Sequence, residues 1–340
     1  MIISKTPFRI SFFGGGTDYP TWFMENGGRV LSVSIDKYCY ITCRSLPPFF
    51  DHDIRVAWSR IENVKNTSDI YHPAVREGLK YMGIRHGISI THEGDLPART
   101  GLGSSSTFIV GLLHVLYAYQ GRMTDKLTLA KEAIYVEQEM IGDNVGCQDQ
   151  IAAAMGGFNR IEFTAQGYNV SPVVLSKDIL RAFESSLMLF YTGLARTASE
   201  IVDEQLKTMG NKQQEMRRMY ALAGEGEARL VSGDIKGFGK LLDETWKIKR
   251  TLSNKISSSY VDDIYEAGTK AGAFGGKLLG AGGGGFVMFI CPPEKQPAVK
   301  TALRNLLYVP VSPEFNGTHI IYYTPDNLDT VTQKGSMENE

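Results

Sequence analysis

The stretch that decides the fold reads Pro97-Ala-Arg-Thr-Gly101-Leu-Gly103-Ser104-Ser105-Ser106. It connects an alternating strand at residues 88–92 to the segment 104–119, whose apolar side chains cover most of a helix circumference and predict a buried helix. Glycines let the backbone approach a ligand closely, and the amino end of a helix offers free N–H groups and partial positive charge. Together these features predict a phosphate-binding loop, and the alternative is a plain glycine turn closed by a serine cap.

Familiar phosphate and dinucleotide motifs do not describe this loop. The pattern GxxxxGK[ST] of Walker A loops occurs nowhere, and Ser106 stands where a dinucleotide fingerprint has its third glycine. The protein-kinase marks HRD and DFG are also absent. The three consecutive hydroxyls at the start of the helix can cap it, or contact a phosphate or its Mg²⁺.

Two further glycine clusters lie elsewhere in the sequence. Gly14-Gly15-Gly16 ends a predicted strand at 2–13 and leads into Asp18, where a ligand contact and a turn closed by the aspartate are equally reasonable. Residues 275–285 contain seven glycines and precede a predicted strand at 286–290. Because glycine loses the most entropy on folding, we favour a loop packed near the phosphate site, with a β-bulge or strand crossing as the alternative.

Two carboxylates stand in unusual positions. Glu137 lies on the apolar stripe of a helix predicted from about 125 to 141, and a carboxylate facing a core is costly unless it binds a metal or a buried cation. Asp149 lies in the first turn of a short helix predicted from 148 to 155, where it can simply stabilise the helix dipole. Both are candidate site residues, and neither is decisive by itself.

Composition excludes several classes of protein. The 340 residues carry 36 Lys and Arg against 37 Asp and Glu, a net charge of -1, so no global field draws the chain to nucleic acid or anionic lipid. Four cysteines without a CxxC pair fit a reducing compartment, and no run of about 20 apolar residues predicts a membrane span. We therefore expect a soluble cytoplasmic protein that binds neither nucleic acid nor membrane and holds any anionic substrate in a local site.

The order of predicted elements indicates an α+β protein of two domains. Strands precede helices in the first half, helices precede strands in the second, and residues 198–251 are mostly helical and charged. With a boundary near residue 180, the N-terminal domain spans 1–180, the C-terminal domain 181–325 and a loose polar tail 326–340. Further strands are predicted at 29–35, continuing into 37–43, and at 186–191 and 319–323.

Taken in order, these motifs resemble those of the GHMP kinases, the family of galactokinase, homoserine kinase, mevalonate kinase and phosphomevalonate kinase. Residues 5–19, KTPFRISFFGGGTDY, are similar to the family's N-terminal motif, and residues 97–106 to its PxxxGLGSS motif. Residues 277–286 are similar to its C-terminal glycine motif, and residues 137–150 to the segment that carries its magnesium Glu and catalytic Asp. Three ordered motifs are far more specific than any one of them.

The resemblance implies the GHMP kinase two-domain fold, with an N-terminal domain like domain 2 of ribosomal protein S5 and a ferredoxin-like C-terminal domain. It implies Mg²⁺ bound by Glu137 and a serine, Ser105 in our choice, although the sequence does not separate the three serines. Asp149 would be the general base or would orient the acceptor hydroxyl, and Arg9 beside it would keep it ionised and offset developing charge. The residues implied in ATP binding are Pro97, Gly101, Leu102, Gly103, Ser104, Ser105 and Ser106.

The sequence departs from galactokinases, which carry Gly-Glu-His where this chain has Gly14-Gly15-Gly16, and this departure argues against galactose. The segments 14–20 and 191–196 resemble the heptose kinase branch instead. That branch phosphorylates D-glycero-D-manno-heptose 7-phosphate at its anomeric oxygen, and the 1,7-bisphosphate feeds nucleotide-activated heptose for bacterial surface polysaccharide. The residues implied in substrate binding are Gly16, Thr17, Asp18, Arg196, Gly282 and Gly283.

Cations for a substrate phosphate, and several rival functions, stay open. Arg196 and Lys37 are candidates for binding the phosphate, and a surface ion pair is the alternative for Lys37. The rival functions are a fucokinase-like or other hexose 1-kinase, a diphosphate decarboxylase of the same fold, and a sensor that binds ATP and sugar without turnover. The Asp18 motif argues against the decarboxylase, and the presence of both Glu137 and Asp149 argues against the sensor. The sequence is compatible with a homodimer.

Overall fold

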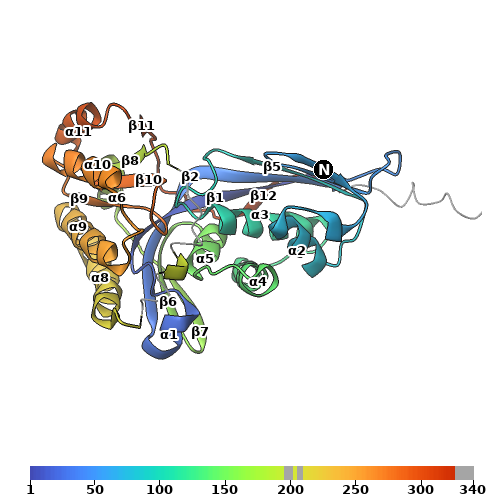
Figure 1. Cartoon of the computed structure of the whole chain (residues 1–340), viewed down its shortest axis with the longest axis horizontal. Coiled ribbons are helices and arrows are strands. Elements are labelled where there is room, and N and C mark those ends of the chain that lie inside the picture. The colour runs from blue at the N-terminus through green and yellow to red at the C-terminus, as the bar shows by residue number, and fades with distance from the viewer. Residues whose placement is uncertain (195–201, 205–209, 326–340) are drawn as a thin grey trace, which may run out of the picture.

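The computed structural model describes residues 1–194, 202–204 and 210–325 of the chain. Among them, two β-sheets stand side by side, each covered by helices, with the larger sheet on the right of Figure 1 and the smaller on the left. Strands and helices alternate irregularly along the chain. The predicted α+β class is therefore confirmed.

The larger sheet has eight strands in the order β12-β1-β2-β5-β3-β4, with β6 pairing to β2 and β7 to β6. The run predicted at 29–35 and continuing into 37–43 is one long strand, β2, whose first part pairs with β6 and whose second part pairs with β5. The strands are β1 (Ile2–Phe13), β2 (Gly28–Ser45), β3 (Ile54–Ala57), β4 (Ile61–Val64), β5 (Ile88–Gly94), β6 (Phe158–Thr164), β7 (Gly167–Pro172) and β12 (His319–Tyr323).

The last strand, β12, does not stay with the second half of the chain. It pairs antiparallel with β1, so that Ile2 faces Tyr323 at the edge of the larger sheet. The segment 181–325 therefore contributes strands to both sheets, which a domain division drawn along the sequence did not anticipate. The boundary near residue 180 stays a prediction.

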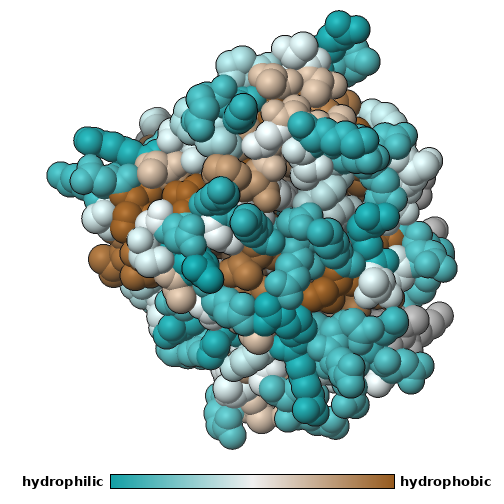
Figure 2. All heavy atoms as spheres, turned by 90° about the vertical axis from the view of Figure 1, so that its left-hand side faces the viewer, coloured by the Kyte–Doolittle hydropathy of each residue, from teal (hydrophilic) through white to brown (hydrophobic). Residues whose placement is uncertain are grey.

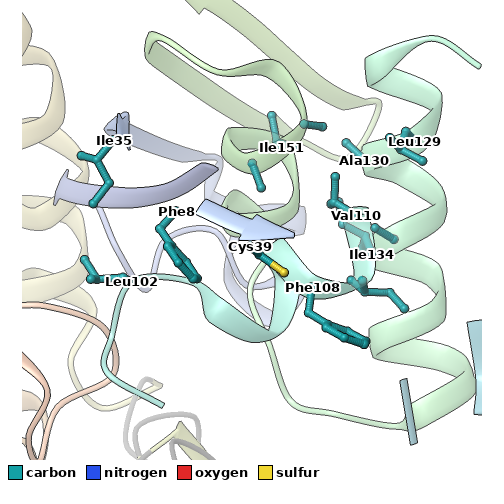
Figure 3. Close-up of a cluster of buried hydrophobic side chains, with 14 of the residues drawn as sticks. Phe8, Ile35, Cys39, Leu102, Phe108, Val110, Leu129, Ala130, Ile134 and Ile151 are labelled. Atoms are coloured by element: carbon teal, nitrogen blue, oxygen red, sulfur yellow. The ribbon is translucent and has the colours of Figure 1, made fainter. Parts of the chain in front are cut away.

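One face of the larger sheet is covered by four helices (Figure 1): α2 (Pro73–Tyr81), α3 (Ser104–Tyr119), α4 (Lys126–Tyr135) and α5 (Gln148–Met155). The helices predicted at 104–119 and 148–155 are confirmed with these bounds. Apolar side chains of α3 such as Val110 pack among those of the sheet and of α4, and Leu102 of the preceding loop belongs to the same core (Figure 3). Two short elements complete this half, α1 (Pro20–Asn26) and a 3₁₀ turn, η1 (Thr67–Asp69).

The helix expected from about 125 to 141 is confirmed over that range, but its last turn is not α-helical. It begins as predicted, with the Asp125 carboxylate accepting a hydrogen bond of 2.9 Å from the N–H of Thr128. From Val136 to Ile141 the chain becomes a π-helix, η2, whose wider turn is rare and is often found at functional sites. This turn holds Glu137 entirely inside the protein, with none of its surface exposed.

The smaller sheet has four antiparallel strands in the order β11-β8-β10-β9. Each of its helices buries one side against the core. The molecular surface on this side is mostly hydrophilic, with separate apolar patches (Figure 2). The strands are β8 (Leu187–Tyr191), β9 (Gly275–Leu278), β10 (Phe286–Ile290) and β11 (Leu307–Tyr308). The helices are α6 (Lys177–Ser186), α8 (Gln213–Val231), α9 (Ile235–Leu252), α10 (Ser259–Lys270) and α11 (Gln296–Ala302), with a 3₁₀ turn, η3 (Pro293–Lys295).

The two halves are joined through β1. The Phe12 ring packs edge-on against Phe238 of α9, with ring centroids 5.4 Å apart. The Lys277 ammonium, on β9, donates to the carbonyl oxygens of Ser11 and Phe12 at 3.0 Å each. These contacts fix the glycine-rich end of the smaller sheet against the strand that carries Arg9.

None of the helices formed by the described residues combines the length and apolar character needed to cross a bilayer.

Candidate active site

The loop before α3 has a backbone shaped for an anion. Arg99, Gly101 and Gly103 have φ angles of 62°, 84° and 76°, so alternate residues are left-handed, a pattern that turns N–H groups toward one centre. Arg99 is the one non-glycine residue with positive φ in the described part of the chain, and such strain collects at functional sites. Gly103 caps α3 without a side-chain hydrogen bond, which leaves N–H groups of the first turn free. The loop therefore fits a phosphate.

The individual side chains of this loop have different tasks. Pro97 is exposed, and its carbonyl accepts a hydrogen bond of 2.8 Å from the Thr100 hydroxyl. Leu102 is wholly buried in the core, so only its backbone can face a ligand. The Ser104 hydroxyl accepts from the N–H of Arg99 at 3.1 Å and is used inside the loop. Ser105 is exposed, whereas Ser106 is buried.

The C-terminal glycine cluster packs against the phosphate loop, which confirms the packing that we favoured. A Cβ at Gly280 would lie 2.3 Å from the Cα of Gly101, and the N–H of Phe286 donates to the Thr100 carbonyl at 3.2 Å. Gly282 and Gly283 lie against Ile256 after α9, and their contact with substrate stays a prediction. The contact with the phosphate loop is made by their neighbours in the cluster.

We expect Gly101→Ala to destabilise the protein by about 1–3 kcal/mol more than Gly121→Ala, and to weaken nucleotide binding. Both glycines have positive φ, but a Cβ at Gly101 would lie 2.4 Å from the Leu279 carbonyl oxygen, whereas nothing lies within 4 Å of one at Gly121. Urea unfolding measures the first effect and calorimetry with ATP the second. Equal losses in the two variants would show that the two glycine loops do not pack as described.

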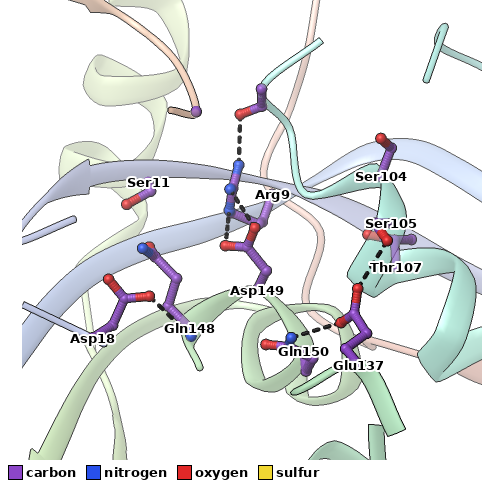
Figure 4. A network of polar contacts seen from close by, with 12 residues as sticks. Arg9, Ser11, Asp18, Ser104, Ser105, Thr107, Glu137, Gln148, Asp149 and Gln150 are labelled. Carbon is purple, nitrogen blue, oxygen red and sulfur yellow. Dashed lines mark hydrogen bonds and ion pairs between the residues drawn. The ribbon is translucent and has the colours of Figure 1, made fainter. Parts of the chain in front are cut away.

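A buried ion pair joins three segments at this loop. The Arg9 guanidinium, on β1, donates from Nε and Nη2 to the two carboxylate oxygens of Asp149 at 2.7 Å each. Its third nitrogen, Nη1, donates to the Gly101 carbonyl at 2.8 Å (Figure 4). Arg9 is 4% exposed, and the Asp149 side chain is 23% exposed, so the carboxylate keeps an open side. Arg9 thus stands beside Asp149, as expected from the sequence.

A second carboxylate approaches the start of α3 from the π-helix. Glu137 accepts hydrogen bonds from the Ser105 hydroxyl at 2.8 Å and from the Gln150 amide at 2.6 Å (Figure 4). Burial raises the pKa of Glu137 to about 7, against the lowering effect of its hydroxyl and amide donors. No Lys or Arg of the described residues forms an ion pair with it. The prediction that Glu137 faces inward is confirmed, without the buried cation that was the alternative.

Glu137 and Ser105 fit a magnesium ion. The residues that the structure describes contain no group of three His, Cys, Asp or Glu side chains that could hold a metal by themselves. Mg²⁺ usually needs no such group, because it binds one or two protein oxygens and takes its other ligands from water and phosphate. A buried carboxylate without a cationic partner, hydrogen-bonded to a hydroxyl beside a phosphate loop, offers this kind of donor set.

Asp18 lies close to the Arg9–Asp149 pair, across the first turn of α5. Its carboxylate accepts from the N–H of Gly16 at 2.9 Å and from the N–H of Gln148 at 3.3 Å. Burial, and then the charge of Asp149, raise the pKa of Asp18. The aspartate therefore closes a turn, as one interpretation of the sequence had it, and its contact with a ligand stays a prediction. In Figure 4 the Gln148 side chain lies between Asp18 and the Arg9–Asp149 pair.

Two other residues named from the sequence, Thr17 and Lys37, do not join the site. Thr17 is wholly buried, and its hydroxyl donates to the Gly14 carbonyl at 2.7 Å, so it holds the turn rather than a ligand, which corrects our expectation. Lys37 forms an ion pair of 2.9 Å with its neighbour Asp36, as the alternative reading had it. Arg196 lies outside the described residues.

Several buried polar residues of the site escaped the sequence analysis. Lys249 of α9 is 8% exposed, and its ammonium donates to the Gly280 carbonyl. Its position after Leu242 and Trp246 on the buried face of α9 was the available signal, hidden because a lysine in a charged helix is normally exposed. Ser11 Oγ and Gln148 Oε1 are buried beside Gly15 and have no hydrogen-bond partner among the residues that the structure describes, and no sequence pattern marked them.

Comparisons with known proteins agree with this geometry. The family model for the GHMP kinases N terminal domain matches residues 69–157, and the model for GHMP kinases C terminal matches residues 227–309, together half of the chain. D-glycero-alpha-D-manno-heptose 7-phosphate kinase of Campylobacter jejuni is 28% identical over 324 residues, covering 89% of this chain and 93% of the relative. A galactokinase of Pyrococcus furiosus is 25% identical, covering 89% and 92% of the two chains.

Solved structures show the same fold. A D-glycero-D-manno-heptose 1-phosphate kinase from Bacteroides thetaiotaomicron superposes with a TM-score of 0.78 at 24% identity, covering 95% of this chain and all of the other. Lactococcus lactis galactokinase complexed with galactose superposes with a TM-score of 0.72 at 19% identity, covering 94% of each chain.

A helix-end phosphate loop with two converging carboxylates, in this fold, defines a phosphotransferase that acts on an alcohol group. The sequence matches identify the family within this class of enzymes. The chain belongs to the GHMP kinase family and is a sugar kinase of that family.

Proposed function

We propose that this protein transfers the γ-phosphoryl group of ATP to the anomeric hydroxyl of D-glycero-D-manno-heptose 7-phosphate and releases the 1,7-bisphosphate. One observation carries the proposal: the Arg9–Asp149 pair and the Ser105–Glu137 pair meet at the amino end of α3. The similarity to the Campylobacter jejuni heptose 7-phosphate kinase supports the choice of acceptor. By the resemblance, the product would serve nucleotide-activated heptose and surface polysaccharide in the cytoplasm.

The phosphate loop would bind the triphosphate through its backbone. Free N–H groups at the start of α3 and the left-handed residues of the loop offer donors to phosphate oxygens. A Mg²⁺ ion held by Glu137 and Ser105 would neutralise charge on the phosphate oxygens. Glu137 is the group that must lose its proton to bind that ion, and burial keeps its pKa near 7.

Asp149 would act on the acceptor. Its carboxylate orients the anomeric hydroxyl and takes its proton, while the anomeric oxygen bonds to the γ-phosphorus and the bond to the leaving ADP oxygen breaks. Arg9 occupies both carboxylate oxygens from one side, so it fixes the orientation of Asp149 and offsets the charge that develops. Asp18, Ser11 and Gln148 are candidates to bind hydroxyl groups of the sugar, since the last two have buried unpartnered oxygens.

We expect D-glycero-D-manno-heptose 7-phosphate to give a kcat/KM at least about 10²-fold above that of free heptose, L-fucose, D-galactose and D-mannose. A phosphate group that meets a dedicated cation contributes on the order of 3 kcal/mol of discrimination. Release of ADP from ATP and Mg²⁺ measures turnover, and phosphorus–proton coupling to the anomeric proton in NMR identifies the new bond. Equal turnover of the free hexoses would contradict heptose 7-phosphate as the acceptor. A preference for L-fucose would favour the fucokinase-like alternative.

A further inference from the structure

Lys249 is a buried cation without an anionic partner. It is 8% exposed, and it forms no ion pair with any residue that the structure describes. Its one hydrogen bond in that part of the chain goes to the Gly280 carbonyl, which leaves two of the three ammonium donors unused. A buried charge is costly unless it is paired, so an ammonium in this position calls for an anion from elsewhere.

The surroundings of Lys249 show which anion fits. Gly280, which accepts from Lys249, packs directly on Gly101 of the phosphate loop, and the Gly101 carbonyl accepts from Arg9. Lys249 and Arg9 are thus bound to two touching glycines. Burial, and then the charge of Arg9, lower the pKa of Lys249 to about 8, against the raising effect of the charge of Asp18. The ammonium therefore lies within electrostatic reach of the acceptor side and of the phosphate side of the site.

Lys277, the other lysine buried here, behaves differently. It is also without an ion pair among the described residues, but its ammonium donates to two backbone carbonyls, those of Ser11 and Phe12, at 3.0 Å each. Those bonds tie β9 to β1 and give Lys277 a structural task. Among the described residues Lys249 has the single carbonyl of Gly280, in the loop that packs on Gly101, so a structural task of that kind does not account for it.

We propose that Lys249 binds phosphate oxygens in the complex of enzyme, ATP and sugar. The inference rests on the proposed function in that it takes the site to hold a sugar acceptor and a nucleotide. Two sources offer the same chemistry: the phosphoryl group in transfer, and the phosphate that the acceptor already carries. An ammonium bound to Gly280, which packs on the phosphate loop, can hold either, whereas Lys37 is paired with Asp36.

The test is Lys249→Met, which keeps the length of the side chain and removes its charge. Lys247→Met is the matched control, two residues away on the same helix, with a side chain 69% exposed and paired to Asp243. Both variants should fold, since a buried unpaired charge is removed in one and a surface ion pair in the other, and thermal unfolding checks this. The substrates are ATP with D-glycero-D-manno-heptose 7-phosphate, and ATP with the unphosphorylated heptose or D-mannose.

If Lys249 binds the phosphoryl group in transfer, kcat falls about 10²-fold or more with phosphorylated and free sugars alike, and the KM of the acceptor changes little. If it binds the acceptor's own phosphate, the KM of heptose 7-phosphate rises about 10-fold or more while turnover of free sugar is unchanged. Kinetics equal to those of Lys247→Met with every sugar would overturn the proposal. Failure of the wild type on heptose 7-phosphate would instead contradict the proposed acceptor, and the comparison on free sugar would still test Lys249.

Discussion

Asp149→Asn is expected to lower kcat by about 10²–10⁴-fold while ATP still binds. Asparagine has nearly the same shape, but its amide cannot take a proton from the acceptor hydroxyl. It also keeps only one oxygen for Arg9, which holds both carboxylate oxygens of the aspartate at 2.7 Å. Release of ADP measures the turnover, and calorimetry with ATP and Mg²⁺ measures the binding that should survive.

The control for this change is Asp178→Asn. Asp178 also stands in the first turn of a helix, α6, so it reproduces the loss of a favourable charge at a helix amino end without touching the site. We expect its kcat to stay within about twofold of the wild type. A kcat for Asp149→Asn within threefold of the wild type would mean that Asp149 neither takes the proton nor orients the acceptor.

Glu137→Gln is expected to move activity and stability in opposite directions. Glutamine can still accept from Ser105, but without the negative charge the variant should need far more Mg²⁺, and kcat should fall about 10²-fold. Stability should rise, because ionised Glu137 is buried without a cation. The measurements are activity against Mg²⁺ concentration, and urea unfolding at two pH values.

The pH dependence of that stability gain has a definite sign. Folding raises the pKa of Glu137 from about 4.5 to about 7, so the folded state resists ionisation, and the wild type loses stability as pH rises between these values. Relative to the wild type, the glutamine variant should gain less than about 1 kcal/mol at pH 5 and on the order of 3 kcal/mol at pH 8.

Glu139→Gln is the control, since Glu139 is an exposed carboxylate of the same π-helix. This variant should change neither the Mg²⁺ concentration needed for activity nor the free energy of unfolding. A gain for Glu137→Gln that is the same at both pH values would show that the buried carboxylate is not the source, and an unchanged demand for Mg²⁺ would exclude Glu137 as the metal ligand.

The sequence was most informative where a pattern is local. The helix at 104–119 and its glycine–serine start are written in consecutive residues, and so is the short helix that carries Asp149. The inward direction of Glu137 also followed from helical spacing, because the position of a residue on a stripe depends only on its near neighbours.

Features that depend on distant partners could not be predicted in this way. The π-helix at 136–141 differs from an α-helix only in which carbonyl each N–H donates to, and the sequence pattern does not show this difference. Lys249 lies on the buried face of α9, but its contact with the Gly280 carbonyl depends on a glycine loop about 30 residues further along the chain, which the spacing of α9 alone does not predict. The hydroxyl of Thr17 is used up by Gly14 and Arg29, so a residue inside a recognisable motif turned out to serve the turn.

The pairing of β12 with β1 has a consequence for biosynthesis. The strand that bears Arg9 finds one of its two neighbours only after residue 323 has left the ribosome, more than 300 residues after β1 itself emerges. Until then one edge of β1 has open hydrogen-bonding groups and is a site for pairing with other nascent chains. The pairing of the strand that carries Arg9 is thus completed late, so a cell lacking chaperones that shield such edges should accumulate this protein in aggregates.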